Sequence, residues 1–77
     1  MKIKLNGEPY ELNQQLSVTD LLAQLDLEPR GVAVERNLIV LKRKSYDSTF
    51  IKEGDEIEVI NFVGGGSLRI LEKNSND

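Results

Sequence analysis

The chain has 77 residues, lacks cysteine, histidine and tryptophan, and carries a formal charge of −3 from 13 acidic and 10 basic side chains. This length fits one small domain. Because cysteine and histidine are absent, the composition excludes disulfides, thiolate nucleophiles, histidine general bases and the usual zinc sites. The acidic balance argues against a nucleic-acid-binding protein, whose surface usually carries a basic stripe. Self-contained catalysis is therefore not expected of this chain.

Long apolar segments are also missing from the sequence. The longest uninterrupted apolar runs, 31–34 and 38–41, are too short to span a bilayer. The first residues alternate between polar and apolar instead of forming the apolar stretch of a signal peptide. We therefore expect a cytoplasmic protein that acts through partners.

The first 13 residues have the pattern of a β-hairpin. Ile3 and Leu5 alternate with lysines, and Tyr10 alternates with polar neighbours on the second strand. Between them, Asn6-Gly7 is the residue pair best suited to a tight hairpin turn. Pro9 stands near the start of the second strand, which is tolerated at a sheet edge.

The hydrophobic period changes from two to 3.6 after the hairpin, which predicts an α-helix. Four apolar residues share one face of this helix: Val18, Leu21, Leu22 and Leu25. Ser17 is a suitable N-cap residue, and Pro29 and Gly31 are predicted to stop the helix. A helix of about nine residues is marginal alone, so its apolar face must pack against a sheet.

Three further strands are predicted after the helix, over residues 32–35, 38–41 and 56–63, with Arg36-Asn37 as the turn between the first two. Residues 42–52 are polar and irregular, and their apolar side chains are expected to anchor this segment on the core: Tyr46, Phe50 and Ile51. A glycine turn at 52–55 leads into the last strand. The order β-β-α-β-β-β indicates an α+β fold, in which a mixed sheet has one helix packed on one face.

The last strand places two apolar residues on the face that should be exposed. Its core face is assigned to Ile57, Val59 and Val63. Ile60 and Phe62 then lie on the opposite face with two glutamates. Either a bulge or a covering loop hides this pair, or the pair is a docking patch for a partner.

Two charged clusters have ordinary explanations. Lys42-Arg43-Lys44 is either a solvated loop or a contact to an acidic partner surface. Four acidic residues near the last turn resemble a weak cation site: Glu53, Asp55, Glu56 and Glu58. A solvated face at the end of a strand explains them better, and no metal is expected.

Gly64-Gly65-Gly66 follows the last strand immediately. Three glycines cost conformational entropy and offer no packing. They are either a flexible linker to residues 67–77 or a thin tail that threads a narrow channel. When extended, three residues reach roughly 10 Å beyond the fold. A tail of that kind would deliver a backbone carboxylate into the active site of a partner.

Three motifs occur together at a definite spacing: V-E-R-N at 34–37, G-D-E-I-E-V at 54–59 and F-V-G-G-G at 62–66. In a chain of this size, they resemble the ThiS/MoaD family of prokaryotic ubiquitin-like sulfur carriers, and the ThiS type in particular. The resemblance covers residues 1–66, including the hairpin and the leucine-rich helix. It implies a β-grasp fold, which agrees with the predicted order of elements.

The resemblance also implies a function and a set of partners. An ATP-dependent adenylating enzyme similar to ThiF or MoeB would activate a glycine carboxylate, which sulfur would convert to a thiocarboxylate. A ThiG-like thiazole synthase would accept the sulfur for the thiazole of thiamine. The residues that match are Gly66 as the thiocarboxylated glycine, Gly64 and Gly65 as the threading tail, and Ile60, Phe62 and Val63 as docking residues. The chain has no G-x-x-x-x-G-K-[ST] loop, so ATP is used by the partner. The carrier is thus a protein substrate, not an enzyme, and binds no cofactor itself.

The C-terminal extension departs from the family pattern, which ends at the glycine. While Gly66 remains in a peptide bond, it has no carboxylate to activate. A peptidase removes residues 67–77, as in similar carriers for sulfur amino acid or molybdopterin synthesis, or the extension remains from a fusion, or the protein no longer carries sulfur.

The extension also sets the expected domain organisation. We expect a β-grasp domain at 1–66 and a flexible extension at 67–77, in which Leu68, Ile70 and Leu71 alternatively pair as an added strand. The remaining alternative is a non-conjugating β-grasp binding module, in which the glycines are only a linker.

Overall fold

The computed structural model describes residues 1–63 and 67–70 of the chain. The elements within these residues are β1 (Lys2–Leu5), β2 (Glu8–Glu11), α1 (Val18–Gln24), η1 (Pro29–Gly31), β3 (Val32–Arg36), β4 (Ile39–Val40), η2 (Arg43–Ser45), β5 (Glu56–Val63) and β6 (Ser67–Ile70). The two η elements are short 3-10 helices. The predicted order β-β-α-β-β-β is confirmed, and β6 follows it.

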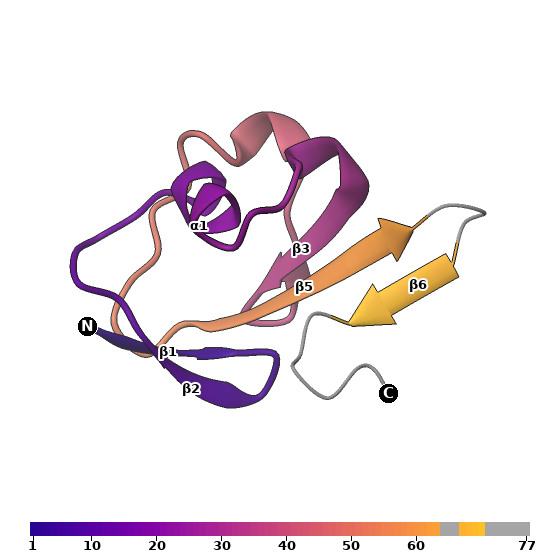
Figure 1. Ribbon diagram of the computed structural model, residues 1–77. Helices are drawn as coiled ribbons and strands as arrows, with labels where there is room; N and C mark the ends of the chain where they lie inside the picture. The colour runs from indigo at the N-terminus through magenta and orange to yellow at the C-terminus, as the bar shows by residue number, and fades with distance from the viewer. Residues whose placement is uncertain (64–66, 71–77) are drawn as a thin grey trace.

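The strands form one mixed sheet in the order β2-β1-β5-β3-β4, with β6 also paired to β5. β1 and β5 run parallel, whereas the other described pairs are antiparallel. α1 lies across one face of this sheet (Figure 1). The structure therefore has the α+β architecture predicted from the sequence.

The hydrophobic core lies between α1 and the covered face of the sheet. α1 contributes side chains that are completely buried: Val18, Leu21 and Leu22. The strands contribute every second residue: Ile3, Leu5, Val32, Val34, Ile57 and Val59. A helical face with period 3.6 and strand faces with period two thus meet in one core.

β1 and β2 form the hairpin predicted at the N-terminal end. Asn6 and Gly7 adopt φ angles of 51° and 82°, which are the left-handed values that a type I′ turn requires. Among the described strands, β2 pairs only with β1. Pro9 therefore lies on an edge strand, where its missing N–H is tolerated.

The N-terminal end of α1 is also as predicted. The Ser17 side chain accepts a hydrogen bond from the Asp20 N–H at 3.0 Å, which satisfies one of the free donors of the first turn. α1 has 7 residues. In the part of the chain that the structure describes, no helix is long and apolar enough to cross a membrane.

The C-terminal end of α1 differs from the prediction. The sequence places the stop at Pro29 and Gly31, but α1 ends at Gln24 and the proline begins η1. The stop comes from Asp26, whose φ is 66°. A residue in this left-handed conformation turns the chain away from the helix.

Two hydrogen bonds stabilise this helix end. The Asp26 N–H donates to the Ala23 carbonyl at 3.0 Å, and the Leu27 N–H donates to the Leu22 carbonyl at 2.9 Å. Together they form a Schellman motif, in which glycine usually occupies the left-handed position. Aspartate in that position explains why the sequence pattern did not reveal the helix end.

The segment between β4 and β5 is anchored by two of the three predicted side chains. Tyr46 is 3% exposed and Ile51 is fully buried. The prediction for Phe50 is wrong, because its side chain is 49% exposed. Consecutive residues of extended chain project to opposite sides. Burial of Ile51 therefore directs Phe50 to solvent.

Candidate functional site

β5 leads from the core to the candidate site. One edge of β5 pairs with β3 from Ile57 to Asn61, in continuous register. The opposite edge pairs with β1 only at Glu56 and Ile57. The last residues of β5 therefore extend beyond β3 and β1, as Figure 1 shows.

Asn6 ends the contact between β1 and β5. Its backbone N–H donates to the Ile57 carbonyl at 2.8 Å. Its side chain accepts from the Val59 N–H at 2.8 Å and donates to the Val59 carbonyl at 3.3 Å. The side-chain amide of Asn6 thus makes the two hydrogen bonds to Val59 that a further residue of β1 would otherwise make. Beyond Val59, this edge of β5 pairs with β6.

The two apolar residues predicted for docking lie on the open face of the sheet. Ile60 is half-buried and Phe62 is 48% exposed. Exposed and buried residues alternate from Glu56 to Val59, Ile60 and Asn61 are both half-buried, and the register with β3 contains no bulge. A bulge therefore does not hide this pair.

Val63 and the glycines are described less completely. Val63 is the last residue of β5, and its backbone pairs with that of Ser67 in β6. Gly64, Gly65 and Gly66 lie outside the described residues. The roles predicted for these four residues, and for Ile60 and Phe62 in docking, therefore stay predictions.

The C-terminal extension continues the sheet over four residues. β6 pairs antiparallel with β5, with Ile60 opposite Ile70 and Phe62 opposite Leu68. This strand corresponds to the added strand that the sequence left open as an alternative to a flexible extension. Residues 71–77 lie outside the described residues, and a domain boundary after residue 66 stays a prediction.

The V-E-R-N and G-D-E-I-E-V motifs meet around one buried carboxylate, that of Asp55, which is 7% exposed. Its Oδ1 accepts from the Asn37 side chain at 3.1 Å, and its Oδ2 accepts from the Lys52 N–H at 2.8 Å. Arg36 forms an ion pair with the same carboxylate at 3.5 Å. The two motifs are therefore contact partners in the fold.

Asn37 completes the connection between the motifs. Its side-chain oxygen accepts from the Glu56 N–H at 2.9 Å, and its own N–H donates to the Glu56 carbonyl at 2.8 Å. The sequence places Asn37 in one turn and Asp55 in another, and it links their two motifs only through the resemblance. The signals that pointed to their role were an asparagine after a strand and an aspartate in a glycine turn.

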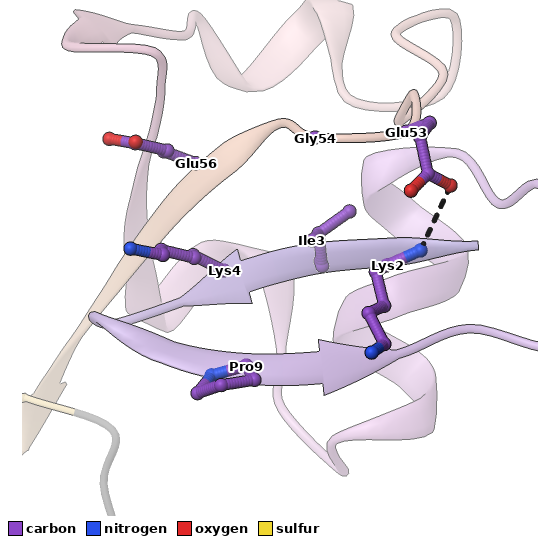
Figure 2. Close-up of a pocket in the computed structure, with 7 residues that line it drawn as sticks. All are labelled: Lys2, Ile3, Lys4, Pro9, Glu53, Gly54 and Glu56. Atoms are coloured by element: carbon purple, nitrogen blue, oxygen red, sulfur yellow. Dashed lines mark hydrogen bonds between the residues drawn. The ribbon is translucent and has the colours of Figure 1, made fainter.

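A hollow at the start of β1 is shown in Figure 2. Its lining residues are Lys2, Ile3, Lys4, Pro9, Glu53, Gly54 and Glu56, and its volume is about 270 Å³. The Lys2 N–H donates to the Glu53 carboxylate at 3.0 Å. The lining contains no hydroxyl, thiol or imidazole group. Among the residues that the structure describes, no group of three or more His, Cys, Asp and Glu is placed to hold a metal ion. We assign no chemistry to this hollow.

The topology defines the class of protein. A hairpin, a helix across the sheet and a central β5 parallel to β1 form a β-grasp domain. The crystal structure of the thiamine biosynthesis protein ThiS from Geobacter metallireducens is similar, with a TM-score of 0.74 and 39% identity over 86% of this chain and 100% of that chain. A family model, that of the ThiS family, matches residues 3–66. The chain belongs to the ThiS family.

The curated relatives include a protein of similar length to this chain and a much longer enzyme. The sulfur carrier protein ThiS of Bacillus subtilis is 35% identical, over 83% of this chain and 98% of that protein. A thiazole synthase of Magnetococcus marinus is 46% identical over 86% of this chain, but the match covers 20% of that enzyme. The chain thus spans about a fifth of the length of this relative.

Proposed function

We propose that this chain is a sulfur carrier of thiamine biosynthesis, and that it is a substrate of enzymes and not itself a catalyst. Its working group is the backbone carboxylate of Gly66. The observation that carries this proposal is the family match, which runs from residue 3 to residue 66 and ends on that glycine. The names of two relatives, a sulfur carrier protein and a thiazole synthase, support the same pathway.

The proposed chemistry compensates for the low reactivity of a carboxylate. On an adenylating enzyme similar to ThiF or MoeB, a carboxylate oxygen of Gly66 attacks the α-phosphorus of ATP and pyrophosphate leaves. Sulfide then attacks the carbonyl carbon, AMP leaves with the oxygen, and a thiocarboxylate remains. A ThiG-like thiazole synthase accepts this sulfur. ATP is bound by the adenylating enzyme, and the carrier contributes the reacting carboxylate.

The geometry of β5 supports delivery of that group. The first residue of β3, Val32, lies opposite Asn61, so Phe62 and Val63 continue past the edge of β3. Glycines have no Cβ atom, and a chain of three is thin enough to enter a narrow channel. In this proposal Ile60, Phe62 and Val63 contact the enzyme while Gly64 and Gly65 thread its channel.

Residues 67–77 must be removed before the carboxylate of Gly66 can be adenylated. Ser67, which directly follows Gly66, is paired with Val63. A peptidase that cuts after Gly66 therefore acts beside a paired strand. Removal of an extension would also suit a carrier for sulfur amino acid or molybdopterin synthesis, which differs in the enzyme that accepts the sulfur.

A non-conjugating binding module is the second candidate. The pairing of β6 with β5 favours it, because the chain continues after the glycines into a paired strand. In a module of this type the glycines only connect two strands. Truncation after Gly66 would then create no reactive group.

Intact-mass spectrometry separates the two candidates. The 1–66 chain is incubated with the ThiF-like enzyme of its host, ATP and sulfide, and the same 1–66 chain with a C-terminal amide is the matched control. The carrier function predicts that only the free carboxylate gains the mass of one sulfur in place of one oxygen. An unchanged mass of the 1–66 chain would overturn the carrier function and leave the binding module.

A further inference from the structure

Two hairpin turns of this chain have similar φ angles but differ in their second residue. Asn6 and Gly7 have φ angles of 51° and 82°, and Asn37 and Leu38 have φ angles of 53° and 72°. Glycine adopts this conformation without steric cost, whereas leucine is strained by its Cβ atom. The first turn contains the favourable Asn-Gly pair. The second turn has Leu38 at the position that corresponds to Gly7.

The fold does not account for the leucine at this position. Asn37 already fixes the turn through its contacts with Asp55 and Glu56. The side chain of Leu38 is 85% exposed, so it adds little to the core. A strained residue that contributes no packing points to a function outside the fold.

Leu38 is followed by two further exposed apolar residues, and we call this edge segment the β4 ridge and define it as Leu38, Ile39 and Val40. Ile39 is 67% exposed and Val40 is 66% exposed. Among the described strands, β4 pairs only with β3, so this ridge forms an edge of the sheet. An exposed apolar edge of this kind is typical of an interaction surface.

A basic segment follows the ridge directly. Lys42, Arg43 and Lys44 are all exposed. The whole chain has a formal charge of −3, so this cluster stands out against an acidic molecule. An apolar ridge followed by three cations complements an apolar pocket with carboxylates on its rim.

The ridge lies far from the glycine end of β5. Arg36 pairs with Ile39 of the ridge and with Ile57 near the start of β5. Val63 comes six residues later, which corresponds to roughly 20 Å along a strand. A protein bound at the ridge therefore leaves the end of β5 accessible. An acceptor enzyme whose surface spans this distance can hold the carrier body at the ridge while the tail reaches its active site.

We infer that the β4 ridge and the basic segment dock into an acidic-rimmed apolar pocket of the thiazole synthase. This inference rests on the proposed function, which supplies the partner. Leu38 is the central contact of the interface, and the cations steer the encounter. A region similar to this chain lies within a thiazole synthase of Magnetococcus marinus, which supports that choice of partner.

The test compares binding with stability in the full-length chain. Leu38→Gly relieves the strain of the turn and removes the contact, so we expect a higher melting temperature and about tenfold weaker binding to the purified thiazole synthase of the host. Gly7→Ala is the matched control, because it strains the corresponding turn away from the ridge. It should lower the melting temperature and leave binding unchanged.

A second variant tests the charges. Lys42→Glu combined with Lys44→Glu should weaken binding at low salt, and the difference from the unsubstituted chain should shrink as salt is raised. Isothermal titration calorimetry measures the affinity of both sets of variants for the thiazole synthase.

Three outcomes would overturn the inference. The first is unchanged binding of Leu38→Gly, and the second is a chain that does not bind the synthase at all. The third is that the chain binds vesicles of anionic phospholipid through the ridge and does not bind the enzyme. None of these results affects the mass assay on the 1–66 chain, so the proposed function is judged separately.

Discussion

The Asp55 carboxylate connects the turn before β5 to the end of β3. It accepts hydrogen bonds from the Lys52 N–H and from the Asn37 side chain, and it pairs with Arg36. Its side chain is only 10% exposed. Removal of this acceptor would leave its donors without a partner inside the protein, and such a loss can cost more than the hydrogen bond itself contributes.

The sequence alone predicted the turn at this position but not the connection. A glycine followed by aspartate identifies a turn from neighbouring residues. The contact from Asn37 to Asp55 joins residues 18 positions apart. No local pattern encodes such a contact, so only the resemblance to a family placed the two motifs together.

Asp55→Ala is expected to lower the free energy of unfolding by about 2 kcal/mol, because it removes a charged acceptor from two part-buried hydrogen bonds and from the ion pair with Arg36. Urea denaturation followed by circular dichroism measures this difference. Glu53→Ala is the matched control in the same turn, since that exposed carboxylate accepts an exposed hydrogen bond from the Lys2 N–H and, among the described residues, no other. Equal effects of the two variants would show that Asp55 does not hold the turn before β5 to the end of β3.

At the scale of the elements, the two ends of α1 show what local sequence determines. Ser17 was predicted as the N-cap because serine before an apolar period is a common signal. The opposite end depends on Asp26 in a left-handed conformation, with φ 66°. Aspartate adopts this conformation less readily than glycine does. The stop was therefore assigned to Pro29 and Gly31 further along.

Asp26→Gly should stabilise the protein by about 1 kcal/mol, since glycine relieves the backbone strain and an acid beside the negative end of the helix dipole is removed. Thermal and urea unfolding measure the gain. Ala23→Gly, at an exposed position inside α1, should instead destabilise by about 1 kcal/mol. A loss of stability in Asp26→Gly would show that the aspartate side chain itself holds the helix end.

At the scale of the whole molecule, β5 is the strand on which the sheet and the candidate site both depend. Its bounds, Glu56–Val63, agree with the sequence prediction, because polar and apolar residues alternate from Glu56 to Val59 and mainly apolar residues continue to the glycines. Its pairing with β6 was left open. Glycines between two segments carry no periodic pattern, so the sequence could not decide whether residues beyond them return to the sheet.

The pairing of β6 can be tested on individual amides of β5. The backbone groups of Val59 face the edge occupied by Asn6. Alternate residues of a strand direct their backbone groups to the same edge, so the N–H groups of Asn61 and Val63 face β6. The N–H groups of Glu58 and Ile60 face β3. Neighbouring amides of one strand therefore report on its two edges.

Truncation after Gly66 removes β6 and should raise the hydrogen-exchange rates of Asn61 and Val63 at least about tenfold, because their edge becomes open to water. Glu58 and Ile60 should keep their rates, since β3 is intact. Amide exchange followed by NMR in the full-length and 1–66 chains measures all four. Arg69→Pro in the full-length chain, which removes an N–H from β6, should reproduce the effect of truncation. Equal rates in all three chains would show that β6 does not occupy this edge in solution, and the extension would then present no paired strand to a processing peptidase.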